Sequence, residues 1–85
     1  MENKSLRVVS LNHNEISRIE NIDDMWIEEL YISQNKLHKI TGLSKLLVLR
    51  TLDLSKNQIV KLRGLETIES LRFLTLALNS IEKVL

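Results

Sequence analysis

Apolar and polar positions along the chain follow one pattern that recurs four times. Each copy opens with three apolar residues, and the second and third of these are separated by one polar residue. Alternation with a period of two is typical of a β-strand that buries one face. The four openings are Leu6, Val9, Leu11; Ile27, Leu30, Ile32; Leu49, Leu52, Leu54; and Leu71, Leu74, Leu76. The pattern therefore predicts four short strands.

The second half of each copy has a different spacing, with an apolar residue at every third position. The three complete series are Ile16, Ile19, Ile22, Met25; Leu37, Ile40, Leu43, Leu46; and Ile59, Leu62, Leu65, Ile68. In an α-helix this spacing spreads the apolar residues over about half of the circumference. A 3₁₀ path keeps residues three apart on one face. We therefore expect a tight, 3₁₀ or irregular return after each strand.

The copies align as repeats of 21 or 22 residues, covering 6–26, 27–48, 49–70 and 71–85. A unit this short cannot bury its apolar face alone, whereas stacked units share one continuous core. We therefore expect a single domain over residues 1–85, with parallel strands. Neither end carries a recognisable polar cap, so we expect either that the chain is part of a longer protein or that it associates end to end.

An asparagine recurs three residues after each predicted strand, at Asn14, Asn35, Asn57 and Asn79. At the bend that follows a strand, backbone N–H and C=O groups lose their ladder partners. One amide side chain offers both donors and an acceptor for such groups. These residues are therefore predicted to form a structural asparagine ladder rather than a catalytic or glycan-bearing set.

The sixteenth place of each repeat, counted from its first residue, holds Asn21, Gly42 or Gly64. Glycine and asparagine tolerate a positive φ better than other residues do. We expect a left-handed backbone at this place, the alternative being that these are ordinary solvated loop residues.

Taken together, the motif L-x-x-L-x-L-x-x-N-x-I/L-x-x-I/L-x-x-I/L resembles the leucine-rich repeat over residues 6–85. It is most similar to the 22-residue class found in the nuclear regulatory subunit of protein phosphatase 1 and in dynein-associated ciliary light chains. The resemblance implies a right-handed α/β solenoid of about four repeats. Its parallel β-sheet would lie on the concave side and 3₁₀ or irregular segments on the convex side. It also implies that a protein partner binds the concave face. We expect no cofactor.

Outward-facing strand positions are the candidate partner-binding residues. They occupy the third and fifth places of the repeats and mix charged, polar and aromatic side chains, as protein interfaces do. The candidates are Glu29, Tyr31, Thr51, Asp53, Phe73 and Thr75. Tyr31, in the middle of the array, is the best candidate anchor. Phe73 and Leu78 could instead pack against a further repeat or cap.

The charge pattern adds a second possibility. The formal net charge is +1, but residues 1–30 sum to −4 and residues 31–85 to +5. A basic series runs through Lys36, Lys39, Lys45, Arg50, Lys56, Lys61 and Arg63. Nucleic-acid binding would require these cations to cluster beside stacking aromatics, and the repeat distributes them over several faces. Nucleic acid is therefore an unlikely partner.

Catalytic chemistry has little support in the sequence. The chain has no cysteine, so thiolate metal sites and cysteine nucleophiles are excluded. His13 and His38 occupy different repeat places, which disfavours a shared metal, and Ser10, His13 and Asp53 lack an orienting pocket for a triad. We expect neither enzyme activity nor a bound metal.

Three functions remain open: a scaffold or regulatory module, a structural segment of a larger solenoid, and a nucleic-acid-associated module of the spliceosomal kind.

The longest aliphatic run is four residues, Leu46 to Leu49, so no membrane span is expected. Residues 1–5 include an acid and lack the apolar stretch of a signal peptide. We expect an intracellular, cytoplasmic protein, with ciliary, cytoskeletal and nuclear locations as narrower options.

Overall fold

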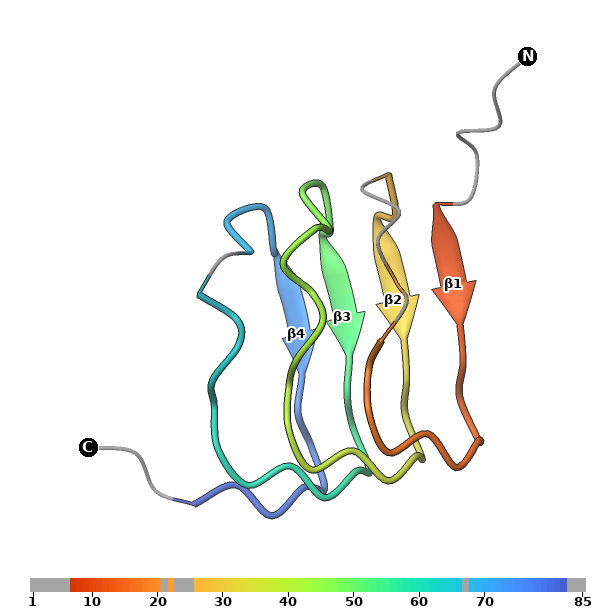
Figure 1. The fold of residues 1–85 in the computed structure, drawn as a ribbon, viewed down its shortest axis with the longest axis vertical. Helices are drawn as coiled ribbons and strands as arrows, with labels where there is room; N and C mark the ends of the chain where they lie inside the picture. The colour runs from red at the N-terminus through yellow and green to blue at the C-terminus, as the bar shows by residue number, and fades with distance from the viewer. Residues whose placement is uncertain (1–6, 21, 23–25, 67, 83–85) are drawn as a thin grey trace.

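Four short β-strands form the regular part of the molecule. The computed structural model describes residues 7–20, 22, 26–66 and 68–82. The strands run parallel in one sheet, in the order in which they occur along the chain (Figure 1). They are β1 (Val8–Ser10), β2 (Glu29–Tyr31), β3 (Thr51–Asp53) and β4 (Phe73–Thr75).

Strand register places equivalent residues of successive repeats side by side. Val9 pairs with Leu30, Leu30 with Leu52, and Leu52 with Leu74. Each repeat place therefore becomes a column across the sheet. A residue type that recurs at one place of the repeat along the chain therefore forms a line of side chains across the sheet.

The hydrophobic core lies between the sheet and the return segments, which we define as the chain from the twelfth place of each repeat to its end. The central strand residues Leu30 and Leu52 are 0% and 1% exposed. Ile19, Ile40 and Leu43 of the return segments belong to the same buried cluster. Since only one residue of each three-residue strand faces this core, its two neighbours face outward.

Return segments consist of turns and bends, and the described residues contain no helix. The expected 3₁₀ character is limited to isolated hydrogen bonds between residues three apart. Leu46 N–H donates to the Leu43 carbonyl and Ile68 N–H to the Leu65 carbonyl, both at 3.1 Å. The irregular path that the spacing of three predicts is therefore present. In the same described residues no helix has the length and apolar character needed to cross a membrane.

Glycines at the sixteenth place adopt the predicted left-handed backbone, with φ of 74° at Gly42 and 95° at Gly64. A Cβ atom added at Gly64 would overlap the carbonyl oxygen of Ile40, and one at Gly42 would overlap that of Ile19. The repeats thus stack closely at this place, and a side chain would force them apart. Asn21, the third residue predicted to be left-handed, lies outside the described residues.

A second left-handed column was not anticipated from the sequence. The eighth place has φ between 57° and 60° in all four repeats, at His13, Gln34, Lys56 and Leu78. The backbone N–H groups of the first three each donate to a carbonyl of the following repeat, at 3.0 Å, 3.1 Å and 2.9 Å. This conformation turns the chain out of the strand, although none of these residues is glycine or asparagine.

Candidate functional site

The outer side of the sheet, which we call the strand face, carries a repeating pattern of outward-facing side chains. Its members come from the third and fifth places of the repeats: Val8, Ser10, Glu29, Tyr31, Thr51, Asp53, Phe73 and Thr75. All six candidate partner-binding residues lie on it. Because the register pairs Glu29 with Thr51 and Thr51 with Phe73, and Tyr31 with Asp53, they form two adjacent columns.

Tyr31 and Glu29 form a polar and aromatic pair at the middle of this face. The phenol of Tyr31 donates a hydrogen bond to Glu29 Oε1 at 2.6 Å. This bond to a carboxylate raises the pKa of Tyr31, with desolvation as a smaller cause in the same direction. The bond also restricts the ring, so less conformational entropy is lost when a partner packs on it.

Asp53, besides facing outward on β3, accepts two hydrogen bonds within the turn that follows this strand. Its Oδ1 accepts hydrogen bonds from the backbone N–H of Ser55 at 3.0 Å and from the Ser55 hydroxyl at 2.8 Å. Such an arrangement stabilises the turn that follows β3. A change at Asp53 therefore disturbs the turn as well as the strand face.

Apolar side chains are exposed at both edges of the strand face. Val8 on β1 is 54% exposed and Phe73 on β4 is 64% exposed. The two central strands present half-buried polar residues between them. The face thus combines apolar edges with a polar centre.

An ion pair joins the first two repeats beside the strand face. Arg7 Nη2 lies 2.8 Å from Glu28 Oε2, and both residues occupy the second place of their repeats. The hydrogen bond from Arg7 lowers the pKa of Glu28. Arg50 and Arg72 occupy the same place in the later repeats, so this rim is mainly cationic.

The recurring asparagines hold the bends together by bridging adjacent repeats. Asn57 Nδ2 donates to the carbonyls of Leu54 and Ser55 in its own bend, both at 3.0 Å, and to the carbonyl of Ile32 in the preceding repeat at 2.9 Å. Its Oδ1 accepts from the N–H of Leu37, also in the preceding repeat, at 3.0 Å. Asn35 and Asn79 bond to their preceding repeats in the same way.

Asn14 differs from the three later asparagines. It is exposed, and its side chain donates only to Leu11 and Asn12 of its own bend, at 2.9 Å and 3.0 Å. In the described residues no repeat precedes it to supply the second set of partners. Asn14 is thus a local turn residue rather than a bridge between repeats.

Asn12 is a bridging residue that the sequence pattern did not single out. Its Oδ1 accepts the backbone N–H of Ser33 in the next repeat at 2.6 Å. Ser33 and Ser55 hold the same seventh place in the next two repeats. The sequence does contain one sign of this role: the first repeat has an amide side chain at the place where the next two repeats have serine.

Residues with catalytic potential are not gathered into a site. His13 lies in the bend after β1, whereas His38 lines a hollow formed by the return segments. In the part of the chain that the structure describes, no three His, Asp or Glu residues are grouped so that they could hold a metal ion.

Comparison with known proteins identifies the repeat. A family model described as Leucine Rich repeat matches residues 2–17 and 45–68. No curated protein and no solved structure matches the chain. The two matched segments include β1 and β3, so the family assignment rests on two separate copies of the pattern.

Proposed function

Since this chain belongs to the leucine-rich repeat family, we propose that it is a scaffold or regulatory module that binds a protein partner on its strand face. Domains of this family are generic protein-interaction modules and typically not enzymes. The proposal assigns the interaction to Glu29, Tyr31, Thr51, Phe73 and Thr75, with Asp53 contributing charge.

One observation carries this assignment: the strand face is continuous across all four repeats and has apolar edges around a polar centre. Tyr31 is of a residue type that contributes strongly to binding energy at interfaces, and Phe73 is of a type enriched in them. The Tyr31–Glu29 hydrogen bond holds the ring of Tyr31 ready for contact. A flat face of this kind suits a protein surface better than a small molecule, which requires an enclosed pocket.

Thr51→Arg is the variant that tests the proposal most directly. Thr51 lies on β3 between Glu29 and Phe73 and makes no side-chain hydrogen bond in the described structure. A long cation there blocks the centre of the face without removing a turn contact, whereas a change at Asp53 would remove one. Affinity capture from cells with quantitative mass spectrometry should show the main partner reduced about tenfold or more.

Ser44→Arg is the matched control, because Ser44 is exposed on a return segment and the change adds the same charge. It should recover the partner at the wild-type level. Circular dichroism spectra and thermal melts should show that both variants fold. Equal recovery by Thr51→Arg and wild type would argue against the strand face as the binding surface.

More specific partner classes rest only on the resemblance to the 22-residue class of leucine-rich repeats. We propose a phosphatase catalytic subunit or a component of the ciliary or cytoskeletal machinery, bound inside the cell in the cytoplasm or nucleus. The same capture experiment distinguishes these classes by the proteins that Thr51→Arg loses and Ser44→Arg retains. Fluorescence imaging of the tagged chain tests the location.

A second candidate function, stacking onto further repeats or a second copy, is favoured by the surface of β4. Leu74 is 39% exposed, while Leu30 and Leu52 at the same place are buried. Leu78 and Phe73 add exposed apolar area beside it. Light scattering after size exclusion tests end-to-end association: Leu74→Lys should abolish any dimer, and a wild-type monomer at all concentrations would contradict self-association.

A further inference from the structure

The return segments carry a line of cations on the side of the molecule away from the strand face. The thirteenth place of the first three repeats holds Arg18, Lys39 and Lys61, all of them exposed. The fourteenth-place residues Ile19 and Ile40 that follow the first two cations are buried in the core. The cations therefore point outward from the segments that these isoleucines anchor, and the stacking of repeats keeps them in line.

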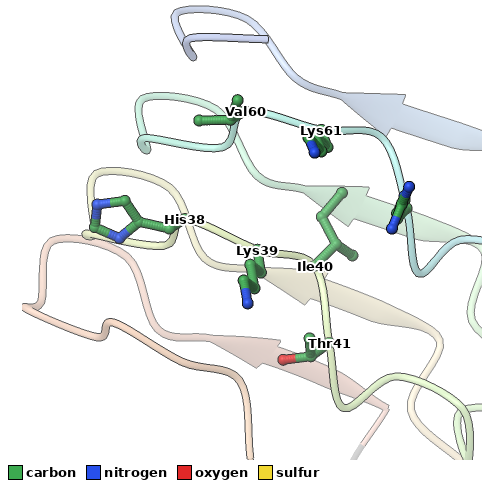
Figure 2. Close-up of a pocket in the computed structure, with 7 residues that line it drawn as sticks. His38, Lys39, Ile40, Thr41, Val60 and Lys61 are labelled. Carbon is green, nitrogen blue, oxygen red and sulfur yellow. The ribbon is translucent and has the colours of Figure 1, made fainter. Parts of the chain in front are cut away.

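Two adjoining hollows follow this line and define what we call the basic groove. One, of about 470 Å³, is lined by His38, Lys39, Ile40, Thr41, Val60, Lys61 and Arg63 (Figure 2). The other, of about 520 Å³, is lined by Ser17, Arg18, His38, Lys39 and Thr41. Because His38, Lys39 and Thr41 line both, the groove runs continuously across three repeats. Neither hollow has an acidic side chain in its lining.

The cations of the basic groove are largely uncompensated. Lys39 and Lys61 take part in no ion pair within the described part of the chain. Arg63 forms no close ion pair there either, but the nearby Glu66 carboxylate compensates part of its charge. Arg18 has a distant partner in Glu20, at 3.8 Å. Cations held together without partners repel one another and attract anions, so the fold leaves a positive field along the groove.

We propose that the basic groove binds an acidic peptide segment of a second protein, in extended form and lying across the repeats. An extended chain directs every second side chain to the same side, so acids at alternate positions can face cations of successive repeats. Val60 and the stem carbons of the lysines provide apolar contact between these charges. Charge complementarity of this kind determines the choice of partner and the rate of association.

Nucleic acid is the competing anion, and the lining of the groove disfavours it. Proteins that bind single strands combine cations with aromatic platforms on which the bases stack. The lining contains no Phe, Tyr or Trp, and Tyr31 and Phe73 lie on the strand face. His38 is the one ring in the lining of the two hollows, so the groove offers abundant charge and little stacking surface.

Fluorescence anisotropy with a labelled peptide of about ten residues, in which glutamate alternates with serine, tests the proposal. The 85-residue chain should bind this probe, and binding should weaken as salt is raised. The double variant Lys39→Glu/Lys61→Glu should weaken binding by about tenfold or more, because two attractions become repulsions. Both residues are exposed, so thermal melts should stay close to wild type.

The matched control is Lys36→Glu/Lys45→Glu, which makes the same charge change at exposed lysines outside the basic groove. It should change the affinity by less than about twofold. Failure of the wild-type chain to bind the probe, or an equal loss in both double variants, would overturn the proposal. So would tighter binding of an oligouridine RNA of similar length. Thr51→Arg should not affect the probe, which separates this surface from the strand face.

Discussion

Replacement of Asn57 by leucine tests how the repeats are held together. Asn57 is 7% exposed, and its amide makes four hydrogen bonds, two of them to the preceding repeat. Leucine has a similar size but can make none of these bonds. The substitution therefore removes the polar bridge while keeping most of the packing volume.

Only two backbone groups lose their hydrogen-bond partner in this variant. The carbonyl of Leu54 keeps the bond from Asn79 Nδ2 at 2.8 Å, and that of Ser55 keeps the bond from the N–H of Gln34 at 3.1 Å. The N–H of Leu37 and the carbonyl of Ile32 are left without their Asn57 partner. Each buried unsatisfied group costs about 1–3 kcal/mol, so together they cost about 2–6 kcal/mol.

Burial of the leucine side chain offsets part of this cost, by up to about 2 kcal/mol. With the unsatisfied groups at the middle of their range, about 4 kcal/mol, the expected net loss is about 2 kcal/mol or more of unfolding free energy. A chain of this length has a total stability of roughly 4–13 kcal/mol, so the loss is a large share of it. Urea titration followed by circular dichroism would measure it as a lower midpoint.

Asn14→Leu is the matched control, because it makes the same chemical change at the same repeat place. Asn14 is exposed and bonds only within its own bend, and the Leu11 carbonyl keeps its bond from Asn35. Its loss should be below about 1 kcal/mol. If the two variants lost equal stability, the bridge between repeats would not be the source of the effect.

Three further predictions concern single contacts. Gly64→Ala should lower the unfolding free energy by about 2–5 kcal/mol, because alanine combines a strained positive φ with overlap on the Ile40 carbonyl; an unchanged thermal melt would contradict this. Lys56→Gly should be neutral or stabilising by up to about 1 kcal/mol, since its φ is 57°; a clear loss in urea titration would show that the backbone there is unstrained. The hydrogen bond from Arg7 lowers the pKa of Glu28 in the folded chain. The pair therefore stabilises the fold at pH values above the pKa that Glu28 has in the unfolded chain, and this stabilisation is lost as pH falls through the lower, folded-state pKa. Arg7→Gln should raise that pKa in an NMR titration of the carboxyl group, and an unchanged value would refute the pairing.

The two binding surfaces proposed here face opposite sides of the core. The strand face presents Tyr31 and Phe73, whereas the basic groove presents Lys39 and Lys61. A chain that used both could hold two proteins at once, which is the property of a scaffold. The paired variants Thr51→Arg and Lys39→Glu/Lys61→Glu separate the two surfaces.

The sequence by itself determined the repeat, the parallel strands and the left-handed glycines. Stacked copies give every place of the repeat nearly the same surroundings, so the requirements of one place appear several times along the chain. Leu30 and Leu52 illustrate this, because both are apolar, both are central in their strand and both are buried. Gly42 and Gly64 recur for a similar reason, since each lies against the backbone of the preceding repeat.

Only the tertiary structure decided features that depend on which copies are neighbours. Asn14 and Asn57 share a repeat place, yet only Asn57 has a preceding repeat to bond. The eighth place is left-handed in all four repeats although it carries no glycine, and in the first three its N–H bonds to the following repeat. Lys39 and Arg63 lie far apart in sequence and line one hollow because stacking brings successive return segments together.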